Sequence, residues 1–180
     1  SRCILPHATS KIRQAEDLEN IASLGFRGEA LASIAAVSRF TITSCNGDES
    51  YKMPSEFGVI KDIQPCGRAR GTTCEAANLF ENTPARLKFM KKPKQEQSEV
   101  TATVIQLIFS RPDISFTYTA DNEKIFSTSG GLYDAIYSVY GKDVGDNLIY
   151  HEKFFDNMKI SGYIGKPGFS KHNRNYQTAV

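Results

Sequence analysis

The sequence has 180 residues, of which 40% are hydrophobic and 23% are charged, an ordinary globular composition. This composition argues against collagen-like, low-complexity and charge-driven disordered chains. Lys and Arg number 22 against 20 Asp and Glu, a net charge of +2, so the overall charge does not indicate a nucleic-acid partner. No apolar run reaches the roughly 18 residues that a membrane helix needs, and we expect no membrane association.

The four cysteines, at positions 3, 45, 66 and 74, contain no Cys-x-x-Cys pair. This spacing is weak evidence for a zinc site or a disulfide framework. The first residues contain no apolar signal-peptide core, so we predict a reducing, cytoplasmic compartment. The sequence does not start with methionine, and we expect it to be an internal piece of a longer protein.

The first half of the chain predicts one helix beside an antiparallel meander. Residues 29–37 have a helical pattern that places Leu31, Ile34 and Ala35 on one face. The pattern then changes to period two, which is typical of strands. The predicted strands lie around residues 40–43, 57–63 and 72–79, with a turn at 46–48.

The second half predicts a long helix over residues 95–110, and its predicted apolar face is Val100, Val104, Leu107 and Ile108. Further elements follow: a hairpin that turns at 121–122, a helix that starts at 132 and ends at Gly141, and strands at 148–155 and 158–164. The small residues at 127–131 mark the best domain boundary. This combination of helices with antiparallel strand pairs indicates an α+β fold.

The segment Ser23-Leu-Gly-Phe-Arg-Gly-Glu-Ala-Leu31 is the most informative part of the sequence. Gly25 and Gly28 allow close approach to the backbone just before a helix, whose first amides favour an anion. Arg27 could add a charge-assisted bond to a phosphate. The alternative is a plain turn into a helix with a solvated arginine.

Two other segments contain groups suited to a polar ligand. Thr9, Ser10 and Lys11 place two hydroxyls and an ammonium in a row, which suits a lid over phosphates; a helix cap or exposed loop is the alternative. His7 beside them is interpreted as structural. Thr72, at the start of a predicted strand, could bond the polar edge of a ligand, or could reflect only the β-propensity of threonine.

Taken together and in this order, three strings resemble the MutL family of DNA mismatch repair proteins, which belongs to the GHKL ATPases. They are His7-Ala-Thr-Ser-Lys-Ile12, Leu24-Gly-Phe-Arg-Gly-Glu-Ala-Leu-Ala-Ser-Ile34 and Asn82-Thr-Pro-Ala-Arg-Leu-Lys-Phe89. The Gly-Phe-Arg-Gly-Glu-Ala-Leu string is specific to MutL-type members. The close resemblance covers about residues 7–41 and 71–93.

The resemblance implies a fold and its division. Residues 1–128 would be the C-terminal portion of a GHKL (Bergerat-type) ATPase sandwich, α+β and incomplete at its N-terminus. Residues 129–180 would begin a ribosomal-protein-S5-like α/β transducer domain.

The resemblance also implies roles for individual residues. The ATP-binding residues would be a lid of Thr9, Ser10 and Lys11, a phosphate loop of Gly25, Phe26, Arg27, Gly28, Glu29, Ala30 and Leu31, and Thr72 at the adenine. The cofactors of the full-length parent would be ATP and Mg²⁺. The family's catalytic Glu-Asn helix and Asp-x-Gly-x-Gly turn have no match in this sequence, so no catalytic or metal-binding residue is assigned. We expect ATPase activity of the parent and none of the isolated chain.

Two groups of basic residues are candidates for DNA contact or, alternatively, are solvated faces. They are Arg86, Lys88, Lys91, Lys92 and Lys94 in the first group and Lys171 and Arg174 in the second. The partners that the resemblance implies are a second copy of the parent, joined through its N-terminal and C-terminal regions, a MutS-type mismatch recognition protein, and double- or single-stranded DNA bound without sequence specificity.

The implied function is coupling of mismatch recognition to later repair steps, through ATP-driven dimerisation and hydrolysis. The location would be cytoplasmic and nucleoid-associated in a bacterium, or nuclear in a eukaryote. Two alternatives remain open: another GHKL ATPase of topoisomerase or chaperone type, and, for this piece alone, a non-catalytic module that contacts DNA or protein.

Overall fold

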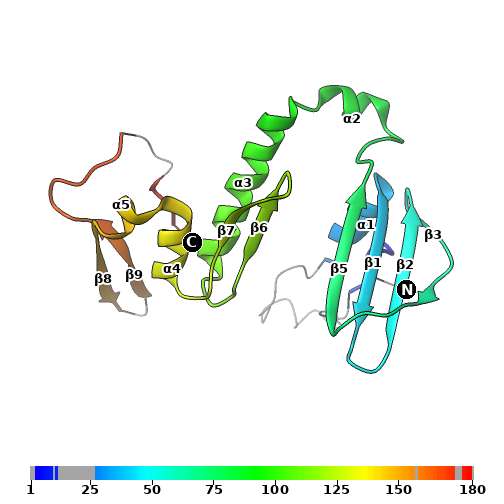
Figure 1. Ribbon diagram of the computed structural model, residues 1–180, viewed down its shortest axis with the longest axis horizontal. Coiled ribbons are helices and arrows are strands. Elements are labelled where there is room, and N and C mark those ends of the chain that lie inside the picture. Colours follow the sequence, from blue (N-terminus) through cyan, green and yellow to red (C-terminus); the bar gives the residue numbers. More distant parts are fainter. Residues whose placement is uncertain (1–2, 10, 12–26, 157, 173–175, 180) are drawn as a thin grey trace. The chain divides into compact units, whose positions relative to one another are not determined.

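The structure is a computed structural model that describes residues 3–9, 11, 27–156, 158–172 and 176–179 (Figure 1). The chain divides into two compact units, Ser1–Met90 and Lys91–Val180, and each is described by itself. This division reflects which residues pack together within the chain. The boundary predicted between residues 128 and 129 separates an ATPase fold from an S5-like fold instead, and it stays a prediction.

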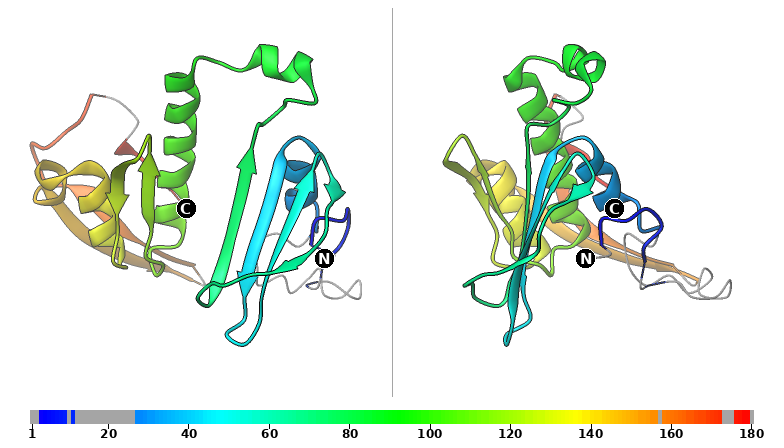
Figure 2. Two further views of the ribbon diagram at one scale, coloured as in Figure 1. Left: turned by 45° about the vertical axis from the view of Figure 1, so that its right-hand side comes forward. Right: turned by 90° about the vertical axis from the view of Figure 1, so that its right-hand side faces the viewer.

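The first unit is an antiparallel sheet with one helix on one of its faces (Figures 1 and 2). Strand β1 lies inside the sheet, between β2 and β5, and β2 also pairs with the short strands β3 and β4. The elements are α1 (Ala30–Ala36), β1 (Arg39–Cys45), β2 (Ser50–Glu56), β3 (Val59–Ile60), β4 (Gln64–Pro65), β5 (Gly71–Ala77) and α2 (Pro84–Phe89).

The core of this unit lies between α1 and the sheet. Ala35 is fully buried, and Phe40 and Met53 are buried beside it together with Ile4. Side chains alternate between the two faces of a strand. Phe40 therefore fixes which face of β1 meets α1, and Ser44, four residues further along, lies on that same face.

The helix over 29–37 and the strand that begins near residue 40 are confirmed by α1 and β1. The predicted apolar face of the helix is partly wrong: Ala35 and Leu31 pack on the core, but Ile34 is 39% exposed. The turn at 46–48 is confirmed, because the Asn46 side chain accepts hydrogen bonds from the amides of Asp48 and Glu49.

The strand predicted over residues 57–63 is mostly wrong, because within this range the structure has only the two-residue strand β3. Phe57 and Gly58 both have positive φ angles, of 48° and 86°, and turn the chain between β2 and β3. The real strand, β2, contains Pro54, which argues against a strand because proline donates no ladder hydrogen bond. The predicted meander is also wrong in its order, since β5 returns to pair with β1.

The second unit contains helices and two separate two-stranded sheets. Its predicted helices and hairpins are confirmed, and the strands at 148–155 and 158–164 match to within one residue. Helix α5 was not predicted, nor was α2 in the first unit. The elements are α3 (Pro93–Ser110), β6 (Thr117–Ala120), β7 (Glu123–Ser127), α4 (Leu132–Tyr140), α5 (Lys142–Gly145), β8 (Leu148–Phe155) and β9 (Met158–Gly165).

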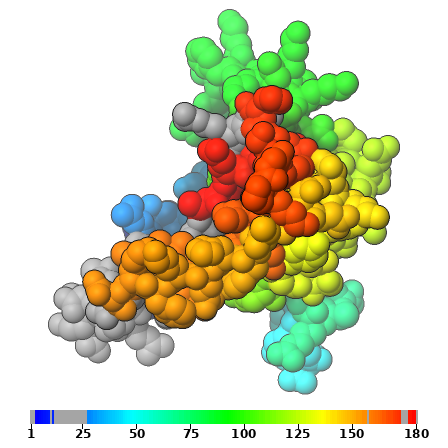
Figure 3. Space-filling model, turned by 90° about the vertical axis from the view of Figure 1, so that its left-hand side faces the viewer, coloured from blue at the N-terminus to red at the C-terminus, as the bar shows by residue number. Residues whose placement is uncertain are grey.

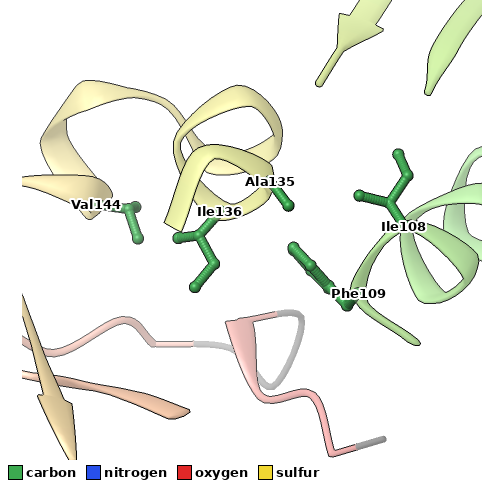
Figure 4. Packing of buried hydrophobic residues seen from close by; sticks show 5 residues of the cluster. All are labelled: Ile108, Phe109, Ala135, Ile136 and Val144. Carbon is green, nitrogen blue, oxygen red and sulfur yellow. The ribbon is translucent and has the colours of Figure 1, made fainter. Parts of the chain in front are cut away.

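The core of the second unit joins α3 to α4 and α5 (Figure 4). Its buried residues are Ile108, Phe109, Ala135, Ile136 and Val144. The predicted apolar face of α3 is therefore partly wrong. Ile108 is fully buried and Val104 packs beside it, but Val100 is 52% exposed and Leu107 is 48% exposed.

The hairpin of β8 and β9 has one markedly apolar side. Ile149, Phe155, Met158, Ile160 and Ile164 are all exposed on it. In the space-filling view of Figure 3 this hairpin, in orange, reaches away from the yellow α4 and α5. No helix in the described part of the chain is long and apolar enough to cross a membrane.

Candidate functional site

The structure brings together the glycine-containing segment before α1 and the segment that contains Thr9 and Lys11. Gly28 has a φ of +67°, and a Cβ built on it would lie 2.6 Å from the carbonyl oxygen of Ala8. Only glycine allows both this backbone conformation and this approach. The main chain of residues 7–9 is therefore packed directly on the loop that leads into α1.

A side-chain contact joins the same two segments. The Nδ1 atom of His7 lies 3.2 Å from a carboxylate oxygen of Glu29, and both side chains are largely exposed. His7 has a positive φ of 60°, so this residue turns the chain where the segments meet. The contact agrees with a structural role for His7.

The start of α1 presents main-chain amides beside this junction. The first helical hydrogen bond runs from the Ser33 amide to the Glu29 carbonyl, at 2.9 Å. The amides of Ala30 and Leu31 precede that bond, and amides in the first turn have no acceptor within a helix. Arg27 is exposed at the entrance to this turn. Ser10, Gly25 and Phe26 lie outside the described residues.

The lid candidates Thr9 and Lys11 are close to each other. The Lys11 amide donates to the Thr9 hydroxyl at 3.2 Å, a local turn typical of threonine. Thr9 follows Ala8 directly, so its hydroxyl belongs to the segment that packs on Gly28. The hydroxyl and ammonium of this segment and the amides at the start of α1 are groups of a kind that can bond an anion.

Thr72 lies at the beginning of β5, directly opposite Ser44 of β1. Directly opposed residues share a face of the sheet, so Thr72 lies on the face that carries α1. Its hydroxyl bonds the Ser44 hydroxyl at 2.8 Å. Sequence reasoning missed Ser44, because only the pairing of β1 with β5 reveals it.

Comparison with known proteins settles the family. No family model matches the chain. The chain is 38% identical to "DNA mismatch repair protein MutL" of Clostridium beijerinckii over 182 residues, covering 99% of this chain and 27% of that protein. It is 43% identical to the protein of the same name from Caldanaerobacter subterraneus subsp. tengcongensis over 175 residues, covering 95% of this chain and 30% of that protein.

The chain belongs to the MutL family. A solved structure described as "Aquifex aeolicus MutL ATPase domain complexed with ADP" matches with a TM-score of 0.62 and 26% identity, over 78% of this chain and 56% of that one. The fold is therefore that of the N-terminal GHKL ATPase region of MutL proteins, and the alternative GHKL classes are not favoured. The chain spans less than a third of the length of the two MutL relatives.

The basic residues of this MutL chain differ in their partners. Arg86 and Lys88 are exposed on α2, and Lys92 and Lys94 are exposed at the start of α3. Lys91 and Lys171 are each held by a carboxylate: Lys91 Nζ lies 2.9 Å from Glu99, and Lys171 Nζ lies 2.8 Å from Asp143. The hydrogen bond with the carboxylate raises the pKa of each ammonium.

The Lys171 ammonium also lies over the rings of Phe169 and Tyr176, at 4.9 and 5.7 Å from their centroids. These contacts give it a role in packing the second unit. Arg174 lies outside the described residues. In the described part of the chain, no three His, Cys, Asp or Glu side chains gather as a metal site.

A cavity of about 570 Å³ lies in the second unit, lined mainly by apolar and aromatic side chains between α4, β9 and the C-terminal segment. Of the predicted site residues that the structure describes, only Lys171 lines it. The described residues of the predicted nucleotide site all belong to the first unit.

Proposed function

We propose that this chain supplies the phosphate loop and the lid of an ATP site in a MutL DNA mismatch repair protein. The observation that carries the proposal is the packing of Ala8 on Gly28, which joins the two motif segments of a MutL family member. The ADP bound by the Aquifex aeolicus relative supports a nucleotide at this fold. ATP binding and hydrolysis would drive dimerisation of the N-terminal regions and couple mismatch recognition to later repair steps.

The described residues fit a triphosphate. Amides at the start of α1 and the Arg27 guanidinium are donors, and Thr9 and Lys11 add a hydroxyl and an ammonium from the other segment. A bound nucleotide would supply the phosphoanhydride bond, and Mg²⁺ would neutralise its phosphates. This sequence has no counterpart of the family's Glu-Asn pair, so we assign neither the base nor a metal ligand to it.

The domain assignment is part of the proposal. Residues 1–128 would be the C-terminal portion of the GHKL ATPase domain, and residues 129–180 would begin the S5-like transducer domain. Helix α4 and the β8–β9 hairpin would belong to this second domain. Proposed partners are a second copy of the parent and a MutS-type protein, in the bacterial cytoplasm at the nucleoid.

Dimerisation of the full-length protein that contains this chain tests the ATP site. With Mg²⁺ and a non-hydrolysable ATP analogue, sedimentation should show association of the N-terminal regions that ADP does not produce. Arg27→Ala should weaken analogue binding about tenfold or more, because it removes a charge-assisted hydrogen bond. Arg70→Ala, an exposed arginine outside both segments, is the matched control. Equal affinity of the Arg27 variant and the wild type would count against the phosphate loop.

DNA contact through the exposed lysines is the second part of the proposed function. Lys88, Lys92 and Lys94 have no ion pair among the described residues, unlike Lys91 and Lys171, so their charges are available to phosphates. Non-specific DNA binding of this kind releases counterions and weakens steeply with salt.

Alanine at Lys88, Lys92 and Lys94 together should weaken DNA binding by the full-length protein to a similar degree for every sequence. The slope of log affinity against log salt should fall by about 2 to 3, because up to three phosphate contacts are lost. Fluorescence anisotropy over a salt series measures this slope. Alanine at Lys91 and Lys171 is the control, and an equal loss in both variants would contradict the assignment.

A further inference from the structure

An exposed apolar patch lies at the end of α2, the helix that follows the last strand of the first sheet (Figure 1). Phe89 is 86% exposed, the largest value among the large apolar side chains that the structure describes. Leu87 and Met90, close to it in sequence, are 48% and 40% exposed. Apolar side chains gathered at the surface in this way mark a site that binds a partner.

The turn that leads into α2 is fixed to the end of α1. The Phe80 amide donates to the Val37 carbonyl at 2.7 Å, and the Asn82 side chain donates to the Ala36 carbonyl at 2.9 Å. Carbonyls at the end of a helix have no partner within it, so the turn supplies theirs. Phe80 has a positive φ of 65°, a conformation that persists only where the surroundings hold it. Helix α2 is therefore anchored to the first unit.

A positive charge lies on the same side of α2 as the exposed ring. Arg86 precedes Phe89 by three positions, and residues three apart are neighbours on a helix surface. The Arg86 guanidinium lies over the Phe80 ring, 5.9 Å from its centroid, and the residue stays exposed. Lys88, one of the lysines proposed to contact DNA, is also exposed. A partner that fits this surface offers a flat apolar face together with negative charge.

Single-stranded DNA combines these two properties. An unpaired base has a free aromatic face, and an exposed aromatic side chain can stack on it whatever the sequence. The phosphates on either side of the base complement the Arg86 and Lys88 charges. In duplex DNA the bases are stacked on each other, so the ring finds no free face there. The combination of ring and cations on one short helix thus favours an unpaired strand over a duplex.

We propose that Phe89 is a base-stacking residue that gives α2 a preference for single-stranded over duplex DNA. This inference rests on the proposed DNA contact through the exposed lysines and deepens it. The lysines hold phosphates of either kind of DNA, and the ring distinguishes between the two.

The test uses two fluorescent single strands of equal length, one of deoxyadenosine and one whose sugars carry no bases. Their binding to the full-length protein is measured by fluorescence anisotropy. Phe89→Ala should weaken binding of the deoxyadenosine strand about tenfold, the scale of one lost base stack. The abasic strand, held by its phosphates alone, should change by less than about twofold. Duplex DNA should behave like the abasic strand.

Three further variants separate stacking from apolar contact in general. Phe89→Tyr keeps an aromatic ring and should bind both strands like the wild type. Phe89→Leu keeps a large apolar side chain without a ring and should behave like Phe89→Ala. Leu87→Ala is the matched control, because it removes another exposed apolar side chain from the same helix and should leave both affinities unchanged.

Equal losses on the deoxyadenosine and abasic strands, or full affinity in Phe89→Leu, overturn the inference. So does unchanged DNA binding in Phe89→Ala, which would assign the patch to a protein partner. A melting temperature that falls in Phe89→Ala as far as in a core substitution also overturns it, because the ring would then be buried in the full-length protein. If alanine at Lys88, Lys92 and Lys94 changes neither affinity, the proposed DNA contact itself fails.

Discussion

Gly28→Val is expected to reduce the ATP affinity of the full-length protein by at least about tenfold. Two effects add at this position. The φ of +67° is strained for a β-branched residue, and the new Cβ would lie 2.6 Å from the Ala8 carbonyl oxygen. The backbone of residues 7–9 would have to move away from the start of α1, which separates the proposed lid from the phosphate loop. Isothermal titration with a non-hydrolysable analogue measures the loss.

Gly47→Val is the control for strain without crowding. Gly47 also has a positive φ, of 119°, but a Cβ there meets nothing within 4 Å, and it lies in the turn between β1 and β2. This variant should lower the melting temperature and leave ATP affinity unchanged. If the two variants lose affinity equally, general destabilisation explains the result; if Gly28→Val binds normally, the contact with Ala8 has no part in the site.

Elements with a clear local period could be predicted from the sequence. The hairpin of β6 and β7 is one, because Asp121 and Asn122 have the positive φ angles of 48° and 65° that such residues tolerate in a tight turn. The hairpin of β8 and β9 is another. In both, neighbouring strands pair across a short loop, and no distant part of the chain decides the outcome.

Elements that depend on distant pairing could not be predicted. Strand β2 contains Pro54, which argues against a strand. The sequence pattern therefore favours a strand among the apolar residues that begin at Phe57. The position of β5 beside β1 rather than beyond β4 is a choice between edges of the sheet, which no local pattern encodes.

The candidate site shows the same division. The motif strings supplied the residues of the proposed phosphate loop and lid. The strings did not predict that Ala8 lies against Gly28, or that Ser44 is the partner of Thr72. Contacts of this kind follow from how separate segments pack and from strand register.

The face of α3 is the clearest case of ambiguity in a periodic pattern. Residues 100, 104, 107 and 108 share one helical face, but Phe109 is buried and Leu107 is half-exposed. An 18-residue helix with apolar residues on several sides is compatible with more than one buried stripe. Helices α4 and α5 decide between them, because the buried residues of α3 pack with those of α4 and α5.

Alanine scanning of two adjacent residues tests this packing directly. Ile108→Ala should lower the free energy of unfolding by about 2 to 5 kcal/mol, since Ile108 is fully buried and the change leaves a cavity. Leu107→Ala should cost about 1 kcal/mol or less, because that side chain is 48% exposed. The two substitutions remove side chains of equal volume from neighbouring positions. Isoleucine has the lower helix propensity, so propensity alone would make Ile108→Ala the less costly change, opposite to the difference expected from packing.

Urea unfolding followed by tyrosine fluorescence measures the difference. The chain has no tryptophan and eight tyrosines, and all of them except Tyr51 belong to the second unit. Tyr140 lies against Phe109, with ring centroids 5.6 Å apart, so the signal reports this core. A lower midpoint at unchanged slope in Ile108→Ala alone would confirm the observed face. An equal shift in Leu107→Ala would show that α3 buries the face that its sequence pattern predicts, and would place α4 and α5 elsewhere on the helix.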